Sequence, residues 1–178
     1  MVCIDDIKKE KGFFVDDRNL NRLFRSPIES YSVISFFVGD ILRVTDDKYQ
    51  RVVSLYDTPV YNFLNDTQEG VNQYRQYCDH YGVSFRTEQC FNHLIEEMSS
   101  SDYDVKKGIL VIDQYGVIAD GQHRACILLK KYGPYYKVNV LRIVWKQNFI
   151  EKFRSHLKMF FPRLKNRFRN KKENSRRG

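Results

Sequence analysis

The residues in this sequence that are best suited to bind a ligand or to catalyse a reaction are the five consecutive residues Asp120-Gly121-Gln122-His123-Arg124. They place a carboxylate, an amide, an imidazole and a guanidinium between two segments that otherwise have the composition of a protein core. The segment before them predicts a strand, and the segment after them predicts a helix. Because the first turn of a helix presents unpaired backbone N–H groups and the positive end of the helix dipole, this junction favours the binding of phosphate.

The polar residues of this DGQHR motif have candidate roles. Gly121 lets a ligand approach the backbone closely, and His123 and Arg124 supply donors, of which the guanidinium matches the fork of phosphate oxygens. Asp120 would repel a bare phosphate, so we expect it to cap the helix, to position Mg²⁺ bridged to phosphates, or to accept a proton from an attacking hydroxyl. In the competing interpretation Asp120 is only an N-cap, and His123 and Arg124 lie on a solvated first turn. The concentration of four functional groups in five residues favours the binding site.

The segments around the motif predict the elements that position it. Short apolar runs rich in Val and Ile predict strands, and Gly133-Pro134 marks the end of the helix that starts at the motif. The predicted elements are a strand over 108–112, a turn over 113–116, a strand over 117–119, a helix over 120–131 and a strand over 137–144. This order predicts an α+β fold in which helices pack on a small mixed sheet.

The residues upstream of the motif predict further strands and helices. The predicted elements are a short helix over 17–24, strands over 31–38, 41–44 and 49–56, a turn or strand end at Pro59, and helices over 67–81 and 87–98. Thr87 is expected to cap the last of these helices, with Glu88 in its first turn. The aromatic stripe of the helix over 67–81 is expected to lie in the core.

The composition limits the class of protein. A length of 178 residues is that of one domain, and a hydrophobic content of 42% with 15% aromatic residues excludes a disordered chain. The four cysteines have no zinc-binding spacing, which favours reduced thiols. The N-terminus has no apolar segment typical of a secretory signal, and no run reaches the about 20 apolar residues that a spanning helix needs. These features predict a cytoplasmic protein.

The excess positive charge lies in the C-terminal segment. Of a net charge of +8, residues 145–178 contribute +10 with twelve Lys/Arg and two Glu, which leaves 18 basic and 20 acidic residues in 1–144. A DNA-binding domain usually carries its basic patch on the folded part. Because the excess positive charge here lies in the C-terminal segment, DNA is the less favoured partner. We therefore predict a domain over 1–144 and a basic tail over 145–178, of which residues 170–178 are expected to be disordered.

The tail has the pattern of an amphipathic helix. Aromatic and leucine residues recur every three or four positions from Trp145 to Phe168, with Lys and Arg between them and an interruption at Pro162. A helix over 145–169 of this kind is expected to bind an anionic membrane, here the inner face of the cytoplasmic membrane. In two alternatives, residues 145–157 pack on the domain as an ordinary helix, and residues 160–177, too basic to be buried, bind RNA or DNA without specificity.

The segment 117–125 (VIADGQHRA) resembles the signature of the ParB/sulfiredoxin superfamily, in which a strand leads into a glycine-containing turn and a helix that begins with His-Arg or Arg-Arg. The resemblance covers residues 87–144, about a third of the chain. Sulfiredoxins place a cysteine immediately before the His-Arg pair, where this chain has Gln122. The chromosome-partitioning ParB proteins carry a GERR-like sequence and a following helix-turn-helix DNA-binding region, and this chain has only the amphipathic tail after Val144.

The motif is closest to the DG-H-HR type of the free-serine kinases of this superfamily. That resemblance implies ATP, ADP or CTP with Mg²⁺ as cofactors. It places Asp120 near the metal or the acceptor hydroxyl, with His123 as a further catalytic candidate, and it surrounds the phosphates with Gly121, Gln122, His123 and Arg124. It also implies an upstream general base, for which the candidates, in order, are Glu88, Asp57 and Glu69.

The resulting expectation is a nucleotide-dependent phosphotransferase that acts on a hydroxylated small molecule or a glycan. DGQHR-type proteins are also similar to small proteins of bacterial surface-polysaccharide biosynthesis, which favours a sugar or lipid-linked glycan as acceptor. The alternative is a ParB-like regulator that binds nucleotide or DNA and either hydrolyses the nucleotide or performs no reaction.

Overall fold

A computed structural model describes residues 27–45, 50–81, 88–147 and 149–177, together with Ile7, Gly12, Phe14 and Val15. Within the long C-terminal helix, side chains are described from Lys158 to Arg176. The short helix predicted over 17–24 and the cap predicted at Thr87 lie outside the described residues.

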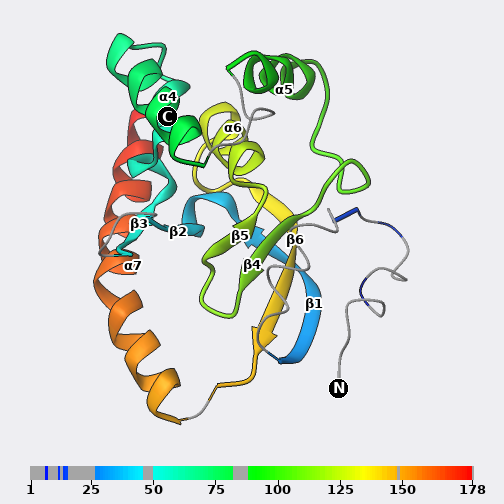
Figure 1. Cartoon of the computed structure of the whole chain (residues 1–178), viewed down its shortest axis with the longest axis vertical. Coiled ribbons are helices and arrows are strands. Elements are labelled where there is room, and N and C mark those ends of the chain that lie inside the picture. The colour runs from blue at the N-terminus through cyan, green and yellow to red at the C-terminus, as the bar shows by residue number, and fades with distance from the viewer. Residues whose placement is uncertain are drawn as a thin grey trace.

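A four-stranded mixed sheet forms the centre of the fold (Figure 1). Its strands lie in the order β1 (Ile28–Phe37), β6 (Lys137–Trp145), β4 (Leu110–Asp113) and β5 (Ile118–Asp120). β1 runs antiparallel to β6, β6 parallel to β4, and β4 antiparallel to β5. The parallel pair requires a crossover, which β5 and the following helix α6 (Gln122–Tyr132) provide. The predicted α+β class with a small mixed sheet is confirmed.

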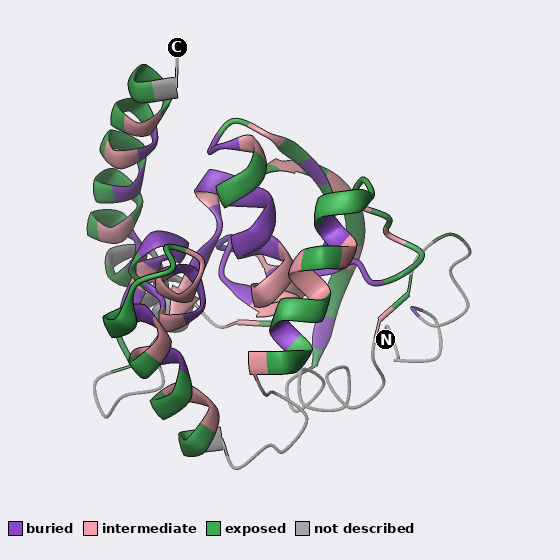
Figure 2. Cartoon of the chain, turned by 90° about the horizontal axis from the view of Figure 1, so that it is seen from above, coloured by how far each residue is buried: buried purple, intermediate pink, exposed green. Residues whose placement is uncertain are grey.

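The sheet is buried on both faces at β4, where Leu110, Val111 and Ile112 have no exposed surface, whereas the edge strand β1 is largely exposed. Leu110 and Ile112 pack with the residues of α6 and the other helices, while Val111 packs on the opposite face with Leu141 and Ile143. Figure 2 shows the buried residues gathered in the middle of the molecule. Cys126 of α6 has no exposed surface, as expected for an apolar residue at that position.

A two-stranded sheet and two short helical segments lie beside the main sheet. β2 (Leu42–Val44) pairs antiparallel with β3 (Val52–Ser54), and both are shorter than the predicted strands. Leu55 to Asp57 form a 3-10 turn, η2, instead of continuing the strand. Pro59 begins helix α3 (Pro59–Phe63), where its missing N–H costs nothing, and the Thr58 hydroxyl caps this helix by accepting from the Tyr61 N–H at 3.2 Å.

Helices α4 (Gln68–Tyr81) and α5 (Glu88–Ser100) confirm the two helices predicted from apolar periodicity. Tyr74 of α4 and Phe91 of α5 are almost completely buried, with their ring centroids 5.1 Å apart. Phe63 of α3 completes this aromatic cluster. The expectation that the aromatic stripe of α4 lies in the core is therefore confirmed at Tyr74.

The C-terminal helix α7 (Phe149–Arg177) differs from the prediction in two ways. It runs through Pro162 without a break, and it continues to Arg177 where residues 170–178 were expected to be disordered. The segment 160–177, expected to be too basic for burial, contributes the buried residues Asn166 and Asn170, and Met159 just before it is also buried. These residues hold the helix against the domain, which explains why it persists beyond the proline. No helix among the described residues is long and apolar enough to span a membrane.

Asp113 holds the turn between β4 and β5. Its Oδ1 accepts hydrogen bonds from the backbone N–H groups of Tyr115 at 2.7 Å and Val117 at 2.8 Å. Burial raises the pKa of this carboxyl to about 6, although the two hydrogen bonds oppose the rise. Between the ordinary pKa of 3.8 and about 6, the folded chain therefore binds more protons than the unfolded chain.

This shift gives a testable pH dependence. As pH rises from about 4 to about 6, Asp113 is expected to lower the free energy of unfolding by up to about 3 kcal/mol, and by less where solvent screens the carboxylate. Asp113→Asn keeps an acceptor oxygen without the charge and should remove this loss. Urea unfolding of both proteins across that pH range measures the difference. Equal slopes of stability against pH in the two proteins would contradict the assignment.

Candidate functional site

The predicted motif lies at the junction of β5 and α6. Asp120 ends β5, and Gly121 is the N-cap of α6 with φ +84° and ψ +22°, in the left-handed region that favours glycine. A Cβ at Gly121 would lie 2.6 Å from Cδ2 of Leu110. The helix begins at Gln122, two residues after the predicted start, and its cap is Gly121, so the interpretation of Asp120 as the N-cap is wrong. Because the cap residue has no side chain, it supplies no capping oxygen to the first-turn N–H groups.

The next three side chains enter different surroundings, since successive helical residues lie about 100° apart around the axis. Gln122 lines a pocket, His123 enters the aromatic cluster between α4 and α5, and Arg124 lies against Gly108. The motif predicted as one phosphate site is thus divided among three places.

His123 is surrounded by rings. Its Nε2 is 3.0 Å from the hydroxyl oxygen of Tyr74, and its ring centroid lies 4.8 Å from that of Phe91 and 6.3 Å from that of Tyr77. Tyr77 itself lines the pocket. The imidazole is therefore placed one side chain behind the pocket wall, where it positions Tyr74 and Tyr77.

Asp120 and Arg124 both act electrostatically on Tyr103, at the end of the sheet beside α5. Burial is the main reason that the pKa of Tyr103 rises to about 12; the charge of Arg124 lowers this pKa, and that of Asp120 raises it. The guanidinium of Arg124 packs so closely on Gly108 that a Cβ there would lie 2.6 Å from it. These two motif residues share one environment, and neither lines the pocket of Gln122.

The pocket has a volume of about 370 Å³, in the range of small-molecule sites. Residues from β2, β3, the η2–α3 segment, α4 and the start of α6 surround it. Its lining residues are Arg43, Val44, Thr45, Val53, Asp57, Thr58, Pro59, Gln73, Gln76, Tyr77, His80 and Gln122. The pocket thus brings together polar side chains from separate parts of the chain at the N-terminus of α6.

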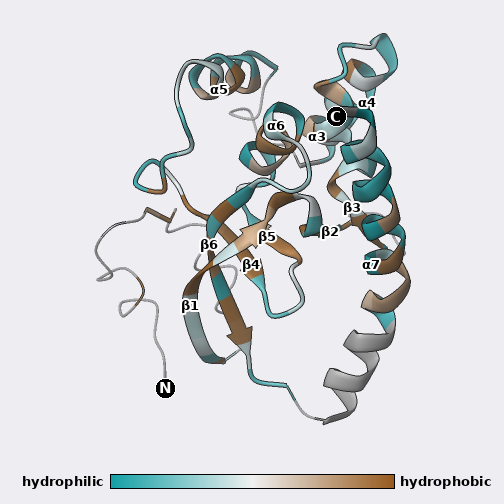
Figure 3. Ribbon diagram, turned by 180° about the vertical axis from the view of Figure 1, so that it is seen from behind, coloured by the Kyte–Doolittle hydropathy of each residue, from teal (hydrophilic) through white to brown (hydrophobic). Residues whose placement is uncertain are grey.

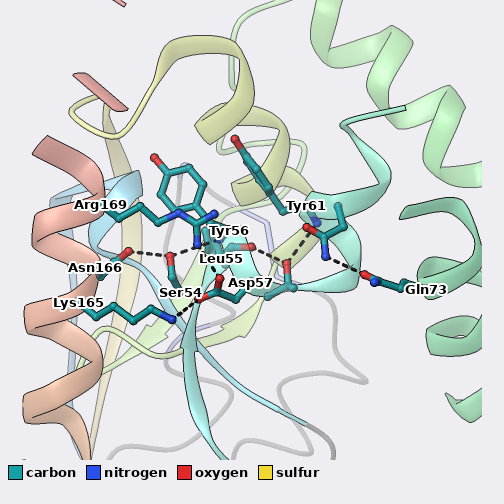
Figure 4. A network of polar contacts seen from close by, with 11 residues as sticks. Ser54, Leu55, Tyr56, Asp57, Tyr61, Gln73, Lys165, Asn166 and Arg169 are labelled. Atoms are coloured by element: carbon teal, nitrogen blue, oxygen red, sulfur yellow. Dashed lines mark hydrogen bonds and ion pairs between the residues drawn. The ribbon is translucent and has the colours of Figure 1, made fainter. Parts of the chain in front are cut away.

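Asp57 is the carboxylate of this lining, and α7 holds it in place. Arg169 donates to its Oδ1 at 2.6 Å, and the ammonium of Lys165 lies 3.6 Å from Oδ2 (Figure 4). The Arg169 guanidinium also stacks over the ring of Tyr56, 4.5 Å from its centroid. On the other side of the pocket the Asn62 amide donates to Oε1 of Gln73 at 2.8 Å. Asp57 therefore lines the pocket while each of its carboxylate oxygens pairs with a cation of α7.

The candidate general bases separate in the structure. Glu88 forms an ion pair with Arg75, including a contact of 3.3 Å to Nη2, and does not line the pocket. Glu69 accepts a hydrogen bond from Gln73 Nε2 at 3.0 Å. Asp57, the second candidate, is the one that the fold brings to the pocket. No residue pattern pointed to Arg43 or His80, because each joins the site only through long-range packing.

Among the described residues, no group of three or more His, Cys, Asp or Glu side chains could hold a metal ion by itself. Mg²⁺ that is bound together with a nucleotide needs only one or two protein carboxylates, because phosphates and water fill its other positions. Asp57 is the carboxylate of the pocket lining and already pairs with two cations of α7, so phosphates and water would be the main ligands of a metal that arrives with its nucleotide.

Comparisons with known proteins add no family. No protein-family model, no curated protein and no solved structure matches this chain. The resemblance to the ParB/sulfiredoxin superfamily stays a prediction carried by the motif.

Proposed function

We propose that the chain is a nucleotide-dependent phosphotransferase that binds its nucleotide phosphates in the pocket of Arg43, His80 and Gln122, within a ParB/sulfiredoxin-like core. The observation that carries the proposal is the position of Gln122. It belongs both to the first turn of α6 and to the pocket lining, so the positive end of the helix and the donors of the pocket converge.

Each lining donor has a chemical task in this proposal. The Arg43 guanidinium and the Gln122 amide donate to phosphate oxygens, and His80 adds a further donor from α4. Mg²⁺ bound to the nucleotide supplies further neutralisation of phosphate charge. Asp57 accepts the proton of the acceptor hydroxyl; this revises the order of the predicted bases and leaves Asp120 as the second candidate.

The reaction follows from these roles. The hydroxyl oxygen of a small molecule or glycan attacks the terminal phosphorus of the nucleotide, the bond from that phosphorus to the bridging oxygen breaks, and the shortened nucleotide leaves with the bond electrons. The hydroxyl proton passes to the carboxylate. Charge develops on the phosphoryl oxygens during this step, and the Arg43 guanidinium stabilises that charge.

A second candidate function is a regulator that binds nucleotide without transferring phosphate. The ion pairs of Asp57 with Arg169 and Lys165 favour it, because they engage both carboxylate oxygens, one of which a general base must turn toward the acceptor hydroxyl. Both candidates require nucleotide binding in the pocket, and only the first requires a carboxylate that accepts a proton.

The experiment is a titration of ATP, ADP and CTP with Mg²⁺ into the full chain, followed by calorimetry and by detection of transferred phosphate on sugar and other hydroxyl acceptors. Arg43→Gln removes a charge-assisted contact worth about 1.5–3 kcal/mol, so we expect roughly 10- to 100-fold weaker binding. Gln122→Leu is expected to weaken binding about tenfold. The control Lys137→Gln changes an exposed cation of β6 outside the pocket and should leave the affinity unchanged.

The two candidate functions separate in the same assay. Asp57→Asn should leave binding within a few-fold and reduce phosphate transfer at least about 100-fold, as loss of a general base does. If Asp120→Asn abolishes phosphate transfer and Asp57→Asn does not, Asp120 is the general base. Binding without transfer supports the regulator, and no binding of any of the three nucleotides refutes both.

A further inference from the structure

The face of α7 that points away from the domain is apolar. Phe160, Phe161 and Phe168 have 60%, 75% and 68% of their surface exposed, and Leu164 has 45%. Phe160, Leu164 and Phe168 recur at four-residue steps, and Phe161 precedes Leu164 by three residues, so the four side chains form one stripe, which we call the outer stripe. Figure 3 shows α7 standing along one edge of the molecule.

The opposite face of α7 packs on the domain through Met159 and two buried amides, which fix the rotation of the helix. Asn166 accepts from the Ser54 hydroxyl at 2.6 Å and donates to the Gly39 carbonyl at 2.5 Å. Asn170, one turn later, donates to the same carbonyl at 2.8 Å. Because two buried amides one turn apart hold this face inward, the outer stripe is held toward solvent.

Basic residues border the outer stripe. Lys158, Arg167, Lys171 and Lys172 are exposed. The acidic residue of the segment 158–176 is Glu173, which pairs with Arg176 at 3.4 Å and is only half-buried. An apolar stripe with cations at its margins is complementary to a surface that has an anionic outer layer over an apolar interior.

We propose that the outer stripe of α7 binds the surface of an anionic lipid bilayer, with the helix axis in the plane of the interface. The rings and Leu164 enter the boundary between headgroups and acyl chains, and the lysines and arginines contact anionic headgroups. A nucleic acid duplex satisfies the cations through its phosphates but offers no apolar layer for four neighbouring side chains, and a single strand, whose bases could stack on the rings, is an alternative that the test below distinguishes. Because the opposite face of α7 is packed against the domain, the domain stays on the aqueous side of the bilayer surface.

The test is flotation of the full chain with vesicles of phosphatidylcholine, with or without about one third phosphatidylglycerol. We expect binding to the anionic vesicles, at least about tenfold stronger than to pure phosphatidylcholine. Phe161→Ser with Phe168→Ser should weaken binding at least about tenfold through lost apolar burial. Lys171→Gln with Lys172→Gln should weaken it about 25-fold, at about fivefold per basic residue.

The matched control is Tyr135→Ser. Tyr135 is an exposed aromatic residue with 48% of its surface accessible, on the loop after α6 and away from the outer stripe, so its loss should leave flotation unchanged. If the lysine pair matters and the phenylalanine pair does not, binding is electrostatic only and the proposal fails. The proposal also fails if the full chain binds a single-stranded oligonucleotide and not anionic vesicles. A circular dichroism spectrum equal to that of the parent shows that each variant is folded.

Discussion

Gly121→Ala is expected to lower the free energy of unfolding by about 2–5 kcal/mol. An alanine at φ +84° costs about 1–2 kcal/mol of backbone strain, and its Cβ would lie 2.6 Å from Leu110, inside a packed core that resists overpacking at about 1–3 kcal/mol. For a chain of this length, that change corresponds to a fall in melting temperature of about 5–15 °C. Denaturant unfolding at constant pH measures the free energy directly.

Gly121→Asn is the matched comparison. Asparagine tolerates the left-handed region better than alanine but brings the same Cβ, so it should keep the steric cost and recover part of the strain. The order of stability should be glycine, then asparagine, then alanine. An alanine variant within about 0.5 kcal/mol of the parent would show that the chain does not turn at Gly121 in the left-handed conformation.

The double replacement of Asn166 and Asn170 by alanine is expected to release α7 from the domain. It leaves the Ser54 hydroxyl without its acceptor and the Gly39 carbonyl without either amide donor, at about 1–3 kcal/mol for each unsatisfied buried group. The total loss should be about 2–5 kcal/mol of the free energy of unfolding. Hydrogen exchange should show faster exchange of the α7 amides than in the parent.

Asn174→Ala is the control, because Asn174 lies on the same helix and is exposed. It should change the stability by less than about 0.5 kcal/mol. If the double variant protects the α7 amides as well as the control does, the buried amides do not anchor the helix. Release of α7 also withdraws Arg169 and Lys165 from Asp57, so the double variant should alter the pocket as well.

Much of the fold could be predicted from local patterns. The apolar runs at β4 and β6 and the periodicity of α4 and α5 identify these elements, since each signal lies within the segment itself. The extent of β3 could not be predicted in this way. Leu55 and Tyr56 have strand-forming side chains, yet the chain turns there into η2, with the Ser54 hydroxyl accepting from the Tyr56 N–H at 3.3 Å.

The orientation of α7 shows a limit of the amphipathic pattern. The pattern identifies an apolar face, predicted to bind a membrane, and a basic face, but it does not identify the side chains that attach the helix to the domain. Here Asn166 and Asn170 find a buried carbonyl at Gly39, which is available because Gly39 lies in the 3-10 turn η1 (Val38–Asp40). That acceptor lies 127 residues from Asn166 in the sequence, and no local signal connects the two.

The position of the candidate site could be predicted from the sequence, but the set of residues that line its pocket could not. Gly121 and the polar residues after it identified the start of α6, and only the cap position was off by one residue. Helical geometry alone would have separated Gln122, His123 and Arg124 around the axis. The pocket partners of Gln122 come from β2, η2 and α4, and only tertiary packing brings Arg43, Asp57 and His80 to it.

The pairing of β1 with β6 has a consequence for the synthesis of the protein. The paired residues run from Phe37 with Lys137 to Ile28 with Trp145, so they are separated by 100 to 117 positions. β1 lies at the edge of the sheet, where its hydrogen-bonded neighbour is β6. While the ribosome is still translating the middle of the chain, β1 has emerged and its own partner strand does not yet exist. The nascent chain therefore carries an unmatched strand edge until at least 100 further residues have been synthesised, and β1 can pair only when β6 has emerged.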